Sequence, residues 1–308
     1  MTTAIIAILY ITTGAMLLCL GIIVGAKKRQ SVITLMRIAQ FAMHYPSLVR
    51  TNQGLRNKNY VAAWNKTSPL IWAHAGGADP VLYGNSMENF DRAIAKGFRC
   101  LEADVGMTSD NIPVLTHLFR PNNENLYEGK PSVEKFKNTK INDKYTPLTL
   151  DMFIERYRSF DGWIFLDGLT FSKNTMFDFR RYFAKVDEDF KRKIIVQVVK
   201  FADLLSLKRN NPFGGIHFSG IFGVGTNKYV RPLLIKALKA CGVKSVSISD
   251  FEVSGRDISE VIQDFRRNDM VVSVAGVNTL SYYKRLRKIG VNCIDSDYLT
   301  PADIQGIE

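Results

Sequence analysis

The sequence predicts an α/β protein, a parallel (β/α)8 TIM barrel preceded by one transmembrane helix, on three observations. The chain has 308 residues, which suits one such barrel with a short attachment. After Pro69, short apolar runs alternate with helical patterns about eight times. Residues 3–26 carry no charged side chain. An open, doubly wound sheet is the structural alternative, because counting strands does not separate it from a barrel.

The first predicted element is the transmembrane helix, residues 3–26. Its length matches the roughly 20 residues that cross the hydrocarbon core of a bilayer. A cleaved signal peptide is the alternative, but its basic residues would precede the apolar run, whereas Lys27, Lys28 and Arg29 follow it. By the positive-inside rule we expect a single-pass membrane protein with a cytoplasmic catalytic domain, and an extracytoplasmic domain is the alternative.

A basic linker, residues 27–68, follows this segment, and no acidic residue precedes Asp79. Apolar residues from Val32 to Ala42 recur at helical spacing, which predicts a helix on the bilayer surface or one packed against the bottom of the barrel. The positive charge favours anionic lipid headgroups. No nucleic-acid partner is expected, because no motif that reads nucleic acid is present.

The barrel is predicted over residues 69–308. Its strands are apolar runs at residues 70–74, 100–105, 163–169, 194–199, 216–224, 245–250, 271–277 and 293–297. A long polar stretch, residues 118–147, interrupts the alternation and predicts an insertion of the kind that covers or contacts a substrate. Cys100, Cys241 and Cys293 fit no metal or redox spacing, so we expect buried thiols.

Two carboxylates share one face of the second predicted strand. The period of two places Glu102 and Asp104 opposite Leu101, Ala103 and Val105. Since the apolar face packs against helices, the carboxylates face the barrel interior, where they need a cation, a basic partner or a proton. Oxygen ligands at this spacing suit Mg²⁺ or Ca²⁺. A structural salt bridge to Arg or Lys is the alternative.

Two of the four histidines occur at strand ends near this pair. His74 ends the first predicted strand, and His117 ends a short extended run at residues 112–116, just before the insertion. One histidine alone in such a place would indicate only a hydrogen-bonded structural residue. Together with the acidic pair, the two predict acid/base catalysis at the mouth of a barrel.

In order, these segments resemble the motifs of the glycerophosphodiester phosphodiesterase family. The family has H-R-G, E-N-T, E-x-D-V-x-x-T-x-D-G and V-x-x-H-D; this chain has H-A-G-G at 74–77, N-S-M-E-N-F at 85–90, E-A-D-V-G-M-T-S-D at 102–110 and V-L-T-H at 114–117. Residues 271–278 and 290–298 resemble the last two barrel strands of the family. The resemblance covers about residues 69–303 and implies a barrel rather than an open sheet.

The resemblance implies a role for each central residue. His74 and His117 would be the acid/base pair, and Glu102 and Asp104 would bind a divalent metal, Mg²⁺ or Ca²⁺. A third acidic ligand is expected at the end of the next strand, where this chain has Asp167. A helix or turn cap is the alternative role for that residue.

Three further residues are candidates for substrate binding: Glu88, Lys200 and Arg120. The resemblance places Glu88 beside the site, although a capping box with Asn85 explains it equally. Lys200 and Arg120 are candidates because phosphate-binding charge is missing elsewhere. Ala75 stands where the family has Arg, and Leu169 stands where a Lys often follows the third acid; Leu118 replaces an Asp.

The resemblance implies a metal-dependent phosphodiesterase that releases an alcohol and glycerol 3-phosphate. Expected substrates are glycerophosphodiesters, lysophospholipids or lipid-linked glycerophosphate polymers. A phosphodiesterase of the same fold that acts on another headgroup or on a surface polysaccharide is one alternative. A membrane-anchored binding protein that has lost turnover is the other, because Ala75 and Leu118 depart from the family pattern.

Overall fold

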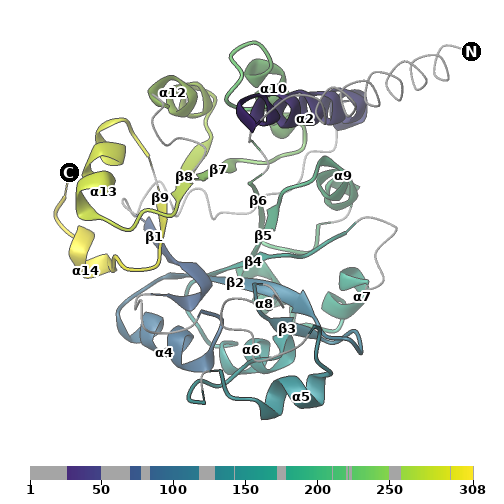
Figure 1. The fold of residues 1–308 in the computed structure, drawn as a ribbon, viewed down its shortest axis with the longest axis vertical. Helices are drawn as coiled ribbons and strands as arrows, with labels where there is room; N and C mark the ends of the chain where they lie inside the picture. The colour runs from purple at the N-terminus through teal and green to yellow at the C-terminus, as the bar shows by residue number, and fades with distance from the viewer. Residues whose placement is uncertain are drawn as a thin grey trace, which may run out of the picture.

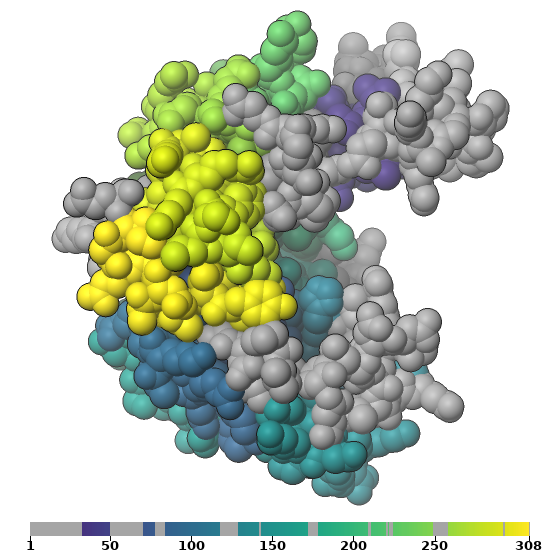
Figure 2. Space-filling view, turned by 60° about the vertical axis from the view of Figure 1, so that its left-hand side comes forward, coloured from purple at the N-terminus to yellow at the C-terminus, as the bar shows by residue number. Residues whose placement is uncertain are grey.

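The protein folds as a closed parallel barrel surrounded by helices (Figure 1). The computed structural model describes residues 26–49, 70–77, 84–117, 129–141, 143–171, 178–209, 211–219, 221, 224–249, 258–291 and 293–307. Around the ring the strand order is β1, β2, β4, β5, β6, β7, β8, β9, and β1 pairs with both β2 and β9. Figure 2 shows the yellow C-terminal segment beside the blue segment near residue 90. The predicted barrel is therefore confirmed.

The strands are β1 (Leu70–Ala73), β2 (Cys100–Met107), β3 (Pro113–Leu115), β4 (Trp163–Asp167), β5 (Ile194–Val198), β6 (Gly215–Phe218), β7 (Ser245–Ser249), β8 (Val271–Ala275) and β9 (Cys293–Ser296). The helices are α2 (Ala26–Val49), α4 (Met87–Ala95), α5 (Val133–Asn138), α6 (Leu150–Arg156), α7 (Phe179–Phe183), α8 (Glu188–Lys193), α9 (Phe201–Arg209), α10 (Arg231–Ala240), α12 (Ser259–Arg267), α13 (Leu280–Lys288) and α14 (Pro301–Ile304), with a 3-10 turn, η1 (His74–Gly76), after β1.

The strand starts agree with the sequence prediction to within one residue and most strand ends to within two, whereas the predicted end of β6 is wrong by six residues. Residues 216–224 were expected to form a strand, but β6 ends at Phe218. Ile221 and Val224 lie beyond it and are fully buried all the same. The strand was predicted too long because a buried connection has the same apolar pattern as a buried strand.

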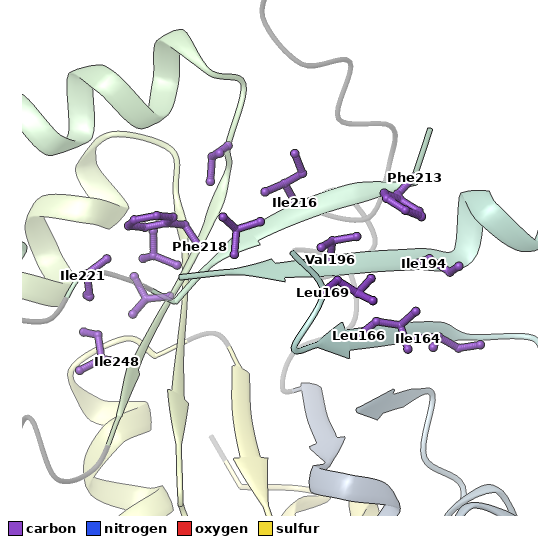
Figure 3. Close-up of a cluster of buried hydrophobic side chains, with 14 of the residues drawn as sticks. Ile164, Leu166, Leu169, Ile194, Val196, Phe213, Ile216, Phe218, Ile221 and Ile248 are labelled. Carbon is purple, nitrogen blue, oxygen red and sulfur yellow. The ribbon is translucent and has the colours of Figure 1, made fainter. Parts of the chain in front are cut away.

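The two larger parts of the apolar core lie on opposite sides of the barrel wall. Outward-pointing side chains pack between the strands and the helices, and Figure 3 shows part of this layer from β4 to β7. A smaller cluster from the strand starts fills the barrel interior: Leu70, Trp72, Cys100, Phe165, Ile195, Val271 and Cys293. The interior is thus plugged at the N-terminal ends of the strands, and the polar side chains are found toward the other end.

Helix α2 packs outside the ring, beside α9 and α10 (Figure 1). Phe41 is 2% exposed, and its ring centroid lies 5.1 Å from that of Phe201 on α9. Leu48 is fully buried, and its carbonyl accepts a hydrogen bond from Lys208. The predicted helix near residues 32–42 therefore forms and packs against barrel helices, while Leu35 and Met43 are half exposed.

The predicted transmembrane segment, residues 3–26, lies outside the described residues except for Ala26, which begins α2. In the part of the chain that the structure describes, no helix combines the length and apolarity needed to cross a bilayer.

The second half of the predicted insertion is structured and tied to the barrel. It contains α5, which begins at Ser132, whose side chain accepts a hydrogen bond from the Lys135 amide. The Val133 amide donates to the carboxylate of Asp110 at 3.0 Å, next to β3. The sequence analysis did not predict α5. This helix is short and buries only Phe136, so its sequence is as polar as that of a loop.

Candidate active site

Three carboxylates from two adjacent strands meet at the C-terminal end of the barrel. Glu102 and Asp104 lie on β2 and Asp167 ends β4, and the strand register pairs Asp104 with Asp167. One oxygen from each carboxylate lies within 4.8 Å of the other two. Three hard oxygen donors so close together fit a single Mg²⁺ or Ca²⁺ ion. The structure thus brings together the three residues that were predicted as metal ligands.

Burial makes this acidic cluster costly without a positive partner. Glu102 is 1% exposed and Asp104 is 7% exposed. Burial and the charge of Asp104 raise the pKa of Glu102 well above its usual range, although His74 opposes the shift. Across the described residues, no Lys or Arg forms a salt bridge with Glu102, Asp104 or Asp167. A bound cation would supply the charge that these side chains lack.

A glycine turn holds Asp167 in place. Gly168 has a φ of +78°, and a Cβ at this position would lie 2.4 Å from the Val105 carbonyl oxygen. Its amide donates to Asp167 Oδ1 at 2.6 Å. Leu169, immediately after the turn, is 4% exposed and packs in the outer core. The position where the family often has Lys therefore belongs to the core of this protein.

Two asparagines hold acidic residues by the same pair of hydrogen bonds. Asn85 donates from Nδ2 to Asp104 Oδ2 at 2.9 Å, and its Oδ1 accepts from the Asp104 amide at 2.9 Å. Asn278, in the loop between β8 and α13, donates to Asp297 Oδ2 at 2.8 Å and accepts from the Asp297 amide at 2.9 Å. Each asparagine thereby fixes both the backbone and the side chain of its aspartate.

His74 lies among carboxylates from both neighbouring strands. Its Nδ1 is 2.5 Å from Asp297 Oδ1, just beyond β9. The amide of Ala75 donates to Glu102 Oε2 at 2.7 Å on the other side. The charge of Asp295, together with the hydrogen bond that His74 Nδ1 donates to Asp297, outweighs burial and raises the pKa of His74 to about 11. The same hydrogen bond lowers the pKa of Asp297.

Asp295, two residues before Asp297, is a further buried acid at this end of the barrel. It is 7% exposed, and its Oδ1 has no hydrogen-bond partner among the described residues. Burial raises the pKa of Asp295 to about 6 despite the opposing charge of His74. Among the described residues, the barrel mouth therefore holds five carboxylates: Glu102, Asp104, Asp167, Asp295 and Asp297.

His117 follows β3, which pairs antiparallel with β2. The Thr116 amide donates to the Asp104 carbonyl at 3.0 Å, so the chain leaves β3 beside the acidic cluster. The His117 side chain is exposed, and its charge opposes the burial that raises the pKa of Asp167. Both predicted histidines thus lie within electrostatic reach of Asp167, because His74 acts on this pKa as well.

The weaker substrate-binding candidates have different surroundings. Glu88 accepts hydrogen bonds from the Thr146 amide at 2.8 Å and the Thr146 hydroxyl at 2.7 Å, so it joins α4 to the insertion. The N-cap of α4 is Ser86, and the expected capping box with Asn85 does not form. Lys200 is exposed just after β5, and Arg120 lies outside the described residues. Their roles in substrate binding stay predictions.

Sequence reasoning assigned no role in the site to four residues that the structure places at the mouth: Asn85, Asn278, Asp295 and Asp297. The two aspartates follow the same alternation that identified Glu102 and Asp104, since they occupy alternate positions at the end of a predicted strand. The alternation rule that was applied to β2 would have identified Asp295 in β9 and Asp297 just after it. The asparagines carry no such signal, because their contacts depend on loop conformations such as the φ of +62° at Asn85.

Residues 74–127 match the model of the Glycerophosphoryl diester phosphodiesterase family. The resemblance to glycerophosphodiester phosphodiesterases is confirmed. The matched stretch includes both histidines and the acidic pair on β2. The enzyme class predicted from the sequence, a phosphoric diester hydrolase of the glycerophosphodiester phosphodiesterase type, is the class that this family match indicates.

The barrel is also similar to solved structures of such enzymes. An Oleispira antarctica phosphodiesterase in complex with the product sn-glycerol-3-phosphate is 19% identical, with a TM-score of 0.62, over 78% of this chain and 96% of that one. A glycerophosphoryl diester phosphodiesterase from Parabacteroides distasonis is 18% identical, with a TM-score of 0.58, over 84% of this chain and 90% of that one. At these identities the likeness shows the fold.

A glycerophosphodiester phosphodiesterase from Agrobacterium tumefaciens is 14% identical, with a TM-score of 0.57, over 75% of this chain and 96% of that one. No protein among the curated sequences matches this chain significantly.

Proposed function

We propose that this protein hydrolyses glycerophosphodiesters, or related lysophospholipids and lipid-linked glycerophosphates, to an alcohol and glycerol 3-phosphate in a metal-dependent reaction. The observation that carries the proposal is the meeting of Glu102, Asp104 and Asp167 at the barrel mouth, with His74 and His117 within electrostatic reach. Active sites of this fold lie at that end of the strands.

Glu102, Asp104 and Asp167 would hold one divalent cation, Mg²⁺ or Ca²⁺. When bound, such an ion neutralises part of the acidic cluster and stabilises negative charge on a phosphate oxygen. Hydrogen bonds within the chain hold the three carboxylates in place: Asn85 fixes Asp104, the Ala75 amide fixes Glu102 and the Gly168 turn fixes Asp167.

The two histidines would transfer the protons. The neighbouring hydroxyl of the substrate glycerol attacks phosphorus and loses its proton to one histidine, while the other protonates the departing alcohol oxygen. Water then opens the cyclic phosphate to glycerol 3-phosphate. We assign the acid to His74, because its Nδ1 is engaged by Asp297 and Nε2 is left to carry a proton to the substrate.

A screen of released alcohols tests the substrate class. Full-length protein in detergent is incubated with glycerophosphocholine, glycerophosphoethanolamine and a lysophospholipid, each with Mg²⁺ or Ca²⁺. We expect glycerol 3-phosphate from at least one, and a loss of roughly 10²–10⁴-fold in kcat for His74→Ala and for His117→Ala. Metal-dependent hydrolysis that both variants retain would contradict the mechanism, and absence of both turnover and metal binding would favour a binding protein without activity.

We also propose that residues 3–26 anchor the protein in a membrane as a single-pass helix, with the barrel on the cytoplasmic side. The uncharged sequence of this segment and the basic residues that follow it support the proposal. The test is alkaline carbonate extraction of membranes that contain the full chain, followed by protease digestion of sealed vesicles. Release into the soluble fraction would refute the anchor, and protection of the barrel in vesicles of inside-out orientation would refute the orientation.

A further inference from the structure

Asp297, the partner of His74, needs support to stay where it is. Its side chain is 41% exposed, so water competes for its oxygens, and Asp295 two residues earlier carries a charge of the same sign. Repulsion between the two carboxylates favours rotation of Asp297 toward solvent. Such a rotation would break the 2.5 Å contact with His74 Nδ1.

Asn278 opposes that rotation with a complete set of contacts. Its Nδ2 donates to Asp297 Oδ2 at 2.8 Å, which leaves Oδ1 for His74. Its Oδ1 accepts from the Asp297 amide at 2.9 Å and from the Ser296 hydroxyl at 3.1 Å. Asn278 therefore fixes the end of β9 and the carboxylate plane together.

We propose that Asn278 is a positioning residue that acts through Asp297 to fix the ring orientation of His74. The inference rests on the proposed function only for the catalytic role of His74. With Asp297 held, Nδ1 keeps the proton of the His74–Asp297 hydrogen bond and Nε2 points away from Asp297 for exchange with substrate. Without Asn278, the ring samples both orientations and only a fraction is productive.

Nuclear magnetic resonance tests the proposal without any need for turnover. Full-length protein labelled with ¹⁵N-histidine in detergent micelles has only four histidines to assign. In the wild type we expect His74 to show a protonated, hydrogen-bonded Nδ1. In Asn278→Ala the Nδ1 proton of His74 should exchange faster with water, so its hydrogen-bonded signal should shift and broaden. His217, which is fully buried and hydrogen-bonded to Ser245 at 2.9 Å, should not change.

Two further variants complete this experiment. Asn278→Asp keeps the oxygen acceptor and the size of the side chain but replaces the donor by a charge that repels Asp297. It should therefore change the His74 signals as well. This variant is used if Asn278→Ala does not fold. Asn268→Ala removes a comparable amide, which donates to the Asp264 carbonyl at 2.9 Å at the C-terminal end of α12, and should leave His74 unchanged. Unchanged His74 signals in a folded Asn278 variant would overturn the proposal.

Kinetics give a second reading once a substrate is hydrolysed. We expect Asn278→Ala to lower kcat roughly 10–100-fold, the usual cost of losing such a partner, with KM changed less than about twofold. In a His74→Ala background the same substitution should cost nothing further, since its effect passes through His74. A loss of equal size in both backgrounds would show that Asn278 acts on the fold and not on His74.

Discussion

Asp295 links the chemistry of the barrel mouth to stability. Its pKa is raised to about 6 from an ordinary 3.8, so between these pH values the folded protein holds a proton that the unfolded chain has lost. Stability contributed by this residue is therefore present at low pH and is lost as the pH rises through about 6. The ionised Asp295 destabilises the metal-free protein at neutral pH.

Asp295→Asn should consequently stabilise the metal-free protein in a pH-dependent way. Thermal unfolding in the presence of a chelator should show a Tm higher by a few degrees at pH 7.5 and nearly unchanged at pH 4.5. Asp161→Asn is the control, because Asp161 is 91% exposed in its pair with Arg99 and should change little. An equal gain at both pH values, or a loss at pH 7.5, would show that the attraction of ionised Asp295 to His74 outweighs the cost of burying its charge.

At the scale of elements, the turn after β4 joins backbone geometry to the metal site. Gly168→Ala would place a Cβ 2.4 Å from the Val105 carbonyl oxygen at a φ of +78°. We expect a cost of roughly 3 kcal/mol in urea unfolding and weaker Ca²⁺ binding in calorimetry, since Asp167 moves with the turn.

A matched control separates the steric clash from the backbone strain. Gly97 has a φ of +84°, but a Cβ there would meet nothing within 4 Å. Gly97→Ala should therefore cost only about 1 kcal/mol and leave Ca²⁺ binding intact. If both variants lose the same stability and bind Ca²⁺ equally well, the Gly168 turn does not position Asp167.

Helix α2 offers a second test at this scale. Phe41→Ala should cost about 3–5 kcal/mol in urea unfolding, because a buried ring is removed from the contact with α9. Met43→Ala, on the same helix but 50% exposed, should change stability by less than about 0.5 kcal/mol. Equal small effects would mean that α2 is not packed on the barrel in solution.

For the whole molecule, the barrel strands could be predicted from the sequence because each is an apolar run of strand length. The inward direction of Glu102 and Asp104 followed from the period of two alone, and Leu101, Ala103 and Val105 do lie in the outer core. The closure of the ring did not follow from the strands. It came from the family resemblance, since an open sheet and a barrel share the same alternation.

The parts of the site that could not be predicted depend on contacts between distant segments. Asn278 and His74 are far apart in the sequence, and both reach Asp297 only because β9 lies between β8 and β1. The family resemblance placed Glu88 beside the site, and the sequence did not predict its hydrogen bonds with Thr146. Loop conformations decide such contacts, and the sequence pattern carries little information about them.

The most direct test of the metal-dependent mechanism is the rate of glycerol 3-phosphate release from glycerophosphocholine, measured for full-length wild type and Glu102→Gln with Mg²⁺ or Ca²⁺, after chelation, and after the metal is restored. We predict that chelation abolishes release by the wild type, that restored metal recovers it, and that Glu102→Gln stays at least about 10²-fold slower at the same metal concentration. Release that persists in chelator, or a Glu102→Gln rate equal to that of the wild type, would contradict the account.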